Sequence, residues 1–386
     1  MRSPSRRHTL PGMDPSSLLH IRSGELLALR LFDIAYSIDL TRAAELWSAR
    51  AGRESRRSRL ATAAPKALAF DVPPLLLDLP PATIDIDGTP VSAQISARLH
   101  DFGVVALAAR IPLADLDWAQ FAERYNALDR TIGAKVATAF WIDLLDQVRH
   151  TLQPALDRPA ANTLEEDYLI GIVQTLAEPL SAEQLRERAD IPALLAGESR
   201  PLSDAARREL MQRSYSYYAD DLVVLGWDRA FVYEPRGDSD VADIIEIANA
   251  QLVEFRYYDE LLDAELPRMY DRVEDARRTV SLLASRRVAQ LAHKLYTLVA
   301  EVTELTEKVD NALQVTEDVY LARVYSGALE LFRVPRIAAA VDRKLAIIRD
   351  TYAALYDEAS SRRAEILEIA IVLLIVVEIV LALLRH

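Results

Sequence analysis

The chain has 386 residues, which is long enough for two or three domains with a sizeable core. Its net charge of −13 excludes a general nucleic-acid binder, because phosphate contacts need a positive surface. It contains no cysteine, which excludes disulfides, thiolate metal sites and a thiol nucleophile. Residues 1–24 have no apolar core of a secretory signal, so we expect a flexible N-terminal tail there.

Residues 25–236 mix strand-like and helix-like patterns. The near-alternation of apolar and polar residues over 25–40 predicts a strand. Asp87-Gly88 is a favoured pair for a hairpin turn, a second hairpin is expected at 100–103, and a further one is expected to turn near 226–229. Helical patterns cover 113–128 and 131–152. Because strands and helices are interspersed, we predict an α+β domain over 25–236.

Residues 237–365 are helical in pattern, and Pro267 and Pro335 are their interruptions. Two series of apolar residues recur at alternating spacings of three and four, which predicts a coiled-coil seam. An antiparallel helical hairpin or small bundle is the simplest arrangement of both series in one chain. An ordinary amphipathic bundle is the alternative, and it differs in whether a second chain completes the seam. The seam residues are Leu291, Leu295, Leu298, Val302, Leu305, Val341, Leu345, Ile348 and Leu355.

Residues 366–384 are the most apolar stretch, with 15 Ile, Leu or Val among 19 residues. As a helix the stretch would be about 28 Å long, close to the thickness of a bilayer's hydrocarbon core. We therefore predict a C-terminal transmembrane helix that continues the last helix of the coiled coil. Arg362 and Arg363 precede it, which favours a cytoplasmic location for the bulk of the chain.

Two carboxylates interrupt this stretch. Glu368 would lie near the membrane boundary, whereas Glu378 lies past the midpoint, where ionisable groups usually face a partner helix. We therefore expect Glu378 to face another chain or helix, so that the stretch also serves assembly. The alternative is a helix buried in an oligomer core with Glu378 paired. The residues assigned to membrane insertion or assembly are Ile366, Glu368, Leu374, Glu378 and Leu384.

Signatures of catalysis are missing from the sequence, and we predict no catalytic residue, cofactor site or metal site. The six histidines never fall at ligand spacing. The segment Asp85-Ile86-Asp87-Gly88-Thr89 resembles the DxDGT motif of haloacid dehalogenase-type phosphatases, in which the first Asp is the nucleophile and the second the acid/base. A proline-rich approach and an alternating segment after it favour a hairpin turn instead. A phosphatase using Asp85 and Asp87 is kept as an alternative.

The layout as a whole resembles the YagE-type family, which includes the mitochondrial "required for meiotic nuclear division" proteins. The resemblance covers most of 25–386. It rests on the segments FDIAYSIDL, HDFGVVAL and DDLVVL, and on a terminal Arg-Arg-x-x-Ile-Leu-Glu followed by IAIVLLIVVEIVLALL. It implies a domain of unknown function with no established catalytic activity, a membrane anchor at the C-terminal helix, and an oligomer. Mitochondrial members support translation at the inner membrane, and the composition here indicates a bacterial relative.

The predicted fold class is an α+β N-terminal domain followed by an all-α coiled-coil hairpin and a C-terminal transmembrane helix. The predicted function is a membrane-anchored, homo-oligomeric, non-enzymatic scaffold or tether that presents the α+β domain to an unknown cytosolic protein partner. Its expected location is the bacterial inner membrane, as a single-pass tail anchor in contact with lipid. The main alternative is a soluble homo-oligomer with buried C-terminal helices.

Overall fold

The computed structural model describes residues 19–51, 55–57, 69–70, 72–133, 139–160, 164–198, 200–237, 240–278, 284–310, 313–314 and 319–384. The chain divides into two compact units. The first comprises Met1–Glu254 and Asp310–Val334, and the second comprises Phe255–Val309 and Pro335–His386.

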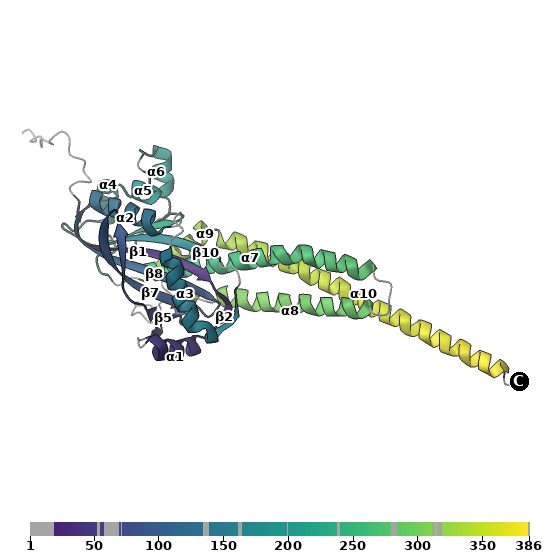
Figure 1. The fold of residues 1–386 in the computed structure, drawn as a ribbon. Coiled ribbons are helices and arrows are strands. Elements are labelled where there is room, and N and C mark those ends of the chain that lie inside the picture. The colour runs from purple at the N-terminus through teal and green to yellow at the C-terminus, as the bar shows by residue number, and fades with distance from the viewer. Residues whose placement is uncertain are drawn as a thin grey trace, which may run out of the picture. The chain divides into compact units, whose positions relative to one another are not determined.

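The first unit is organised around a ten-stranded sheet (Figure 1). Its strands lie in the order β11-β12-β13-β10-β1-β8-β7-β5-β3, and β6 pairs with β7 outside this series. Neighbours are antiparallel, except that β10 and β13 are parallel. The strands are β1 (His20–Asp33), β3 (Ser55–Arg57), β5 (Leu75–Asp78), β6 (Ala82–Ile86), β7 (Thr89–Leu99), β8 (Val104–Asp117), β10 (Glu165–Leu176), β11 (Ser214–Tyr215), β12 (Leu222–Leu225) and β13 (Arg229–Tyr233). Two short pairs lie outside this sheet: β2 (Ala35–Ile38) with β9 (Leu156–Pro159), and β4 (Ala69–Phe70) with β14 (Leu313–Gln314).

One face of the sheet packs on α2 and α3, and the main apolar core lies between them. Alternate residues of β1, such as Leu26, Ala28 and Phe32, point into this core because successive side chains of a strand face opposite sides. The hydroxyl of Tyr125 on α2 donates to the carbonyl oxygen of Leu169 on β10 at 2.9 Å. The helices of this unit before β11 are α1 (Leu40–Ala51), α2 (Trp118–Ile132), α3 (Ala139–Leu152), α4 (Ala182–Arg188), α5 (Ile191–Ala196) and α6 (Asp204–Leu210).

The opposite face of the sheet is covered as well. The intervening residues of β1, such as Leu27 and Leu29, are buried there. The beginning of α7 (Val241–Arg278) reaches this face, since Asp243 bonds to Arg98 of β7. Phe332, which directly follows α9 (Val319–Leu331), also reaches this face, since its ring lies 5.4 Å from that of Tyr168 on β10. The sheet is therefore the middle layer of three.

The second unit is helical. It contains the rest of α7, α8 (Ala284–Asp310) and most of α10 (Val334–Leu384), which is continuous over 51 residues. The Lys344 ammonium of α10 lies 2.7 Å from carboxylate oxygens of both Asp259 and Asp263 on α7. The rings of Tyr296 on α8 and Tyr352 on α10 lie 5.8 Å apart. α10 therefore packs within the chain on both of the other helices.

The predicted C-terminal transmembrane helix is wrong. Among the residues that the structure describes, no helix has the length and the apolar character needed to cross a membrane. Side chains are described without a break over 368–381, which is 14 residues including two glutamates. That stretch is about 21 Å long, short of the roughly 30 Å of a hydrocarbon core. The predicted tail anchor and inner-membrane location are wrong for the same reason, and the class is an α+β region followed by several helices.

Candidate functional site

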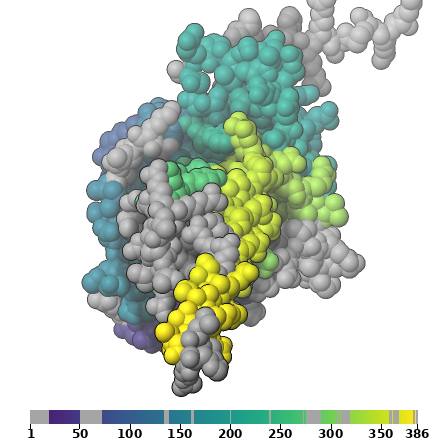
Figure 2. Space-filling view, turned by 90° about the vertical axis from the view of Figure 1, so that its right-hand side faces the viewer, coloured from purple at the N-terminus to yellow at the C-terminus, as the bar shows by residue number. Residues whose placement is uncertain are grey.

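The end of α10 carries the largest run of exposed apolar side chains among the described residues. Every described side chain from 368 to 381 is exposed, so the apolar surface goes all the way round the helix. Leu374 is 68% exposed and Leu384 is 79% exposed, while Glu368 and Glu378 are exposed beside them. The side chain of Ile366 lies outside the described residues. Figure 2 shows the end of α10 in yellow at the surface of the chain.

Such a surface is unusual for a helix that has no partner beyond its own chain. A helix that is apolar on all sides is normally buried on all sides, and exposed apolar patches of this kind mark interaction sites. Eleven large apolar residues between Ile369 and Leu381 are about half exposed or more. The end of α10 is therefore a candidate interface.

The predicted seam residues lie mostly inside the second unit. Val302, Val341 and Ile348 are almost fully buried within the chain itself. Leu298 is partly exposed, and the side chain of Leu305 lies outside the described residues. The other seam residues are also buried, namely Leu291, Leu295, Leu345 and Leu355.

The segment from Asp85 to Thr89 forms a two-residue hairpin turn. Ile86 pairs with Thr89 across the antiparallel strands β6 and β7. Asp87 and Gly88 both have positive φ angles, of 48° and 80°, as a tight hairpin of this length requires. The phosphatase motif needs its first Asp at the end of a buried parallel strand, and β6 is antiparallel to β7. The geometry therefore does not match that motif.

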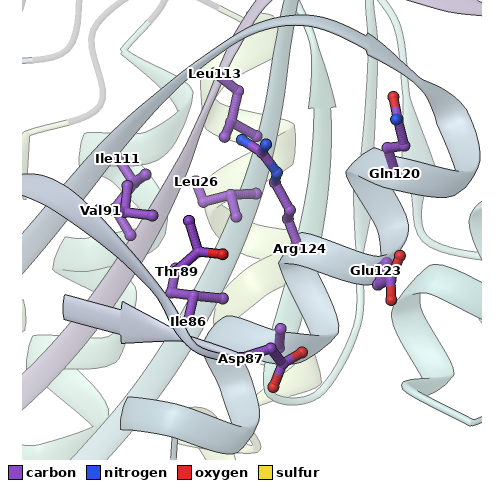
Figure 3. Close-up of a pocket in the computed structure, with 11 residues that line it drawn as sticks. Leu26, Ile86, Asp87, Thr89, Val91, Ile111, Leu113, Gln120, Glu123 and Arg124 are labelled. Carbon is purple, nitrogen blue, oxygen red and sulfur yellow. The ribbon is translucent and has the colours of Figure 1, made fainter.

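This turn lies at the edge of a pocket of about 260 Å³ between α2 and the sheet (Figure 3). The pocket's floor and walls are apolar, and its rim carries Asp87, Thr89, Gln120, Glu123 and Arg124. The Asp87 carboxylate accepts a hydrogen bond from the Arg130 guanidinium at 2.8 Å, so its charge is paired. The apolar lining residues are Leu26, Ile86, Val91, Ile111, Leu113 and Ala127.

A cluster of buried charges lies on the other face of the sheet. Arg98 of β7 bonds to the Asp243 carboxylate at 2.8 Å, and its Nε lies 3.3 Å from an oxygen of Glu246. His100 Nε2 lies 4.0 Å from the same Glu246 oxygen. Arg98, His100 and Glu246 are all nearly inaccessible to solvent. Charges buried this deeply are tolerated only when they are paired.

Burial sets the protonation of this cluster. It raises the pKa of Glu246 to about 7, although the positive charge of Arg98 opposes that rise. Burial and Arg98 together lower the pKa of His100 to about 3, so His100 is neutral at physiological pH. Burial acts to lower the pKa of Arg98, but the carboxylates of Glu246 and Asp243 outweigh it and raise that pKa. Arg98 is therefore a permanent cation that holds the beginning of α7 on the sheet.

No group of three or more His, Asp or Glu that could hold a metal ion occurs within the described ranges. The protein thus combines three features: a sheet with helices on both faces, a second unit made of helices, and an exposed apolar end of α10. The family described as "Uncharacterized protein MJ0711, N-terminal domain" matches residues 23–240, more than half of the chain. The chain belongs to this family.

One relative is the protein named "Uncharacterized protein MJ0711" from Methanocaldococcus jannaschii. It is 24% identical over 224 residues, a match that covers 58% of this chain and 67% of that protein. The matched family domain ends at 240, where α7 begins. These comparisons do not test the resemblance to the YagE-type family, which stays a prediction.

The sequence prediction missed the pocket and the buried charge cluster. Arg98 and Glu246 are 148 positions apart, and spacing along the chain gives no sign of such a pair. The one local signal was polar residues in an otherwise apolar segment at the beginning of α7, where Glu246, Asn249 and Glu254 are all buried.

Proposed function

We propose that this protein is a homo-oligomeric, non-enzymatic scaffold whose copies join through the ends of their α10 helices and display the sheet-containing unit to a protein partner. The observation that carries the proposal is the apolar surface from Ile369 to Leu381, whose large side chains are about half exposed or more. The occupant of that surface is the same helix of other copies.

The size of this surface supports association. Burying the remaining exposed area of eleven Ile, Leu and Val side chains would contribute on the order of 10 kcal/mol per copy, at roughly 1 kcal/mol each. Association costs about 4–15 kcal/mol in lost freedom of motion. A bundle of several helices therefore suits this surface better than a two-helix pair, which would leave half of each helix exposed.

The burial of the predicted seam residues within the chain also favours an interface at the end of α10. Val302, Val341 and Ile348 are already buried inside the chain, so they have little surface left for a second copy. The end of α10 has no such partner among the described residues. Assembly is therefore expected at the end of α10 rather than along the seam.

The oligomeric state tests the proposal. We expect the purified full chain to be larger than a monomer in light scattering coupled to size-exclusion chromatography, without detergent. Substituting Leu373→Asn, Leu374→Asn and Val377→Asn together should release monomers. Ile142→Asn, at a position 54% exposed on α3, is the matched control and should leave the size unchanged. A wild-type monomer, whether free or bound to lipid vesicles, would overturn the proposal.

The proposal that the protein is not an enzyme can be tested separately with a phosphatase assay. Asp85 lies on β6 opposite Pro90 of the antiparallel strand β7. We expect purified protein to release no phosphate from p-nitrophenyl phosphate with magnesium present. Turnover that disappears in Asp85→Asn would favour the phosphatase alternative instead.

A further inference from the structure

The pocket between α2 and the hairpin of β6 and β7 has an apolar interior and a positive group at its rim. Its apolar lining comes from four strands and one helix, so it is a built cavity within a single compact unit. Its volume of about 260 Å³ is just below the range of roughly 300–1,000 Å³ that is usual for small-molecule sites. A ligand would therefore be small, and the mixed apolar and polar lining suits an amphipathic one.

Arg124 is the positive group. It extends from α2 across the pocket toward Leu113 and Leu26, whereas Gln120 and Glu123 project to the other side of the view (Figure 3). Arg124 makes no hydrogen bond or ion pair with another residue of the described ranges. Its guanidinium thus has donors that no described residue uses, and a guanidinium prefers to bind a carboxylate through two of them.

The acidic groups at the rim do not cancel this preference. The Asp87 carboxylate is engaged by Arg130. Glu123 is adjacent to Arg124 in the helix, and adjacent residues of a helix do not face each other. With Arg130 included, the rim carries two acidic and two basic groups. An anion would therefore bind at Arg124 itself rather than through a net positive charge of the rim.

We propose that this pocket binds a small amphipathic carboxylate, with the apolar chain among Leu26, Val91 and Leu113 and the carboxylate on Arg124. A medium-chain fatty acid is the simplest molecule of this class. The site lies within the first unit and does not depend on assembly through α10.

Titration of the full chain with octanoate, followed by ligand-observed NMR or calorimetry, tests the proposal. We expect saturable binding of octanoate that weakens as salt is added, and at least tenfold weaker binding of octylammonium, whose charge opposes Arg124. Arg124→Gln should weaken octanoate binding about tenfold because the charge-assisted contact is lost. Glu123→Gln, the matched control on the same helix, should leave the affinity equal or slightly tighter.

Filling the pocket provides the second arm. Val91→Phe places an aromatic ring inside the pocket and should abolish octanoate binding. The unfolding temperature of this variant reports whether the fold is kept. If that variant does not fold, Thr89→Phe at an exposed position of the same wall replaces it. Octanoate that binds as tightly to Arg124→Gln and to the filled variant as to wild type would be binding elsewhere, such as on the end of α10, and would overturn the proposal. So would the absence of binding to wild type.

Discussion

Two helical segments of this protein contrast in what they bury. The first turns of α7 carry Glu246, Asn249 and Gln251, yet each of these side chains is at most 3% exposed. The end of α10 carries almost only Ile, Leu and Val, yet every described side chain from 368 to 381 is exposed. The polar segment is covered by its own chain and the apolar one is not. The contrast shows that hydrophobicity predicts a need for a partner, whereas the fold decides whether the same chain supplies it.

Arg98, the buried arginine on β7, is where a substitution should most strongly destabilise the polar beginning of α7. Arg98→Met would leave the buried carboxylate of Glu246 and the partly buried one of Asp243 without their cation, and breaking a buried pair typically costs about 3–5 kcal/mol. Denaturant unfolding at pH 8 measures the loss. Arg42→Met removes an exposed arginine paired with Glu45, and it should cost less than about 1 kcal/mol. Equal effects of the two substitutions would contradict a structural role for the cluster.

The raised pKa of Glu246 makes the free energy of unfolding depend on pH. Because the folded pKa of about 7 lies above the usual glutamate pKa of 4.5, folding takes up a proton between these values. The resulting stability is fully present below about pH 4.5 and is lost as the pH rises through about 7. From this group alone the loss approaches about 3 kcal/mol.

Glu246→Gln should remove this pH dependence, since an amide does not titrate. The difference in unfolding free energy, variant minus wild type, should therefore increase from pH 5 to pH 8. Chemical denaturation at a series of pH values checks it, and the difference cancels titrations shared by both proteins, including that of His100. A constant difference across this range would show that Glu246 does not titrate there.

A single hydrogen bond on α7 offers a smaller test. The Tyr325 hydroxyl of α9 donates to the side-chain oxygen of Gln251 at 2.7 Å, and both residues are buried. Tyr325→Phe should destabilise the fold by about 1–2 kcal/mol, because the buried amide loses its donor. Thermal unfolding measures the change. Tyr217→Phe, whose ring is 64% exposed, should change stability by much less.

The smallest expected effect belongs to the end of α10. If copies assemble there, their Glu378 carboxylates come close together and repel one another at neutral pH. Glu378→Gln keeps the shape and removes the charge, so it should strengthen assembly by roughly 1 kcal/mol per copy. Sedimentation of serially diluted protein would show the oligomer persisting to lower concentration. An unchanged dissociation profile would place Glu378 outside the interface.

Local features were the ones that sequence could predict. The hairpin at Asp87-Gly88 was predicted because that pair tolerates the positive φ angles of a two-residue turn. The interspersed strands and helices before 237 and the helices after it likewise follow from patterns within short windows. The transmembrane prediction failed because it treated 366–384 as one continuous apolar span. The described part of that stretch does not have the length and apolar character needed to cross a membrane.

The candidate sites depend on residues that are far apart in sequence. Arg124 and Val91 line one pocket from α2 and β7, and Arg98 meets Glu246 across the sheet. Alternation along a strand shows that it has two faces, but not which helix covers each one. Lys344 likewise pairs with Asp259 because α10 packs on α7, which heptad spacing alone does not specify.

By itself, the sequence determined the hairpin turns, the helical character of the chain after 237 and the apolar character of the chain's end, because these depend on neighbours a few residues away. Only the tertiary structure decided that the polar beginning of α7 is buried, that Arg124 crosses a pocket and that the end of α10 is exposed. Burial and pairing depend on what packs against a residue, and that partner comes from distant parts of the chain.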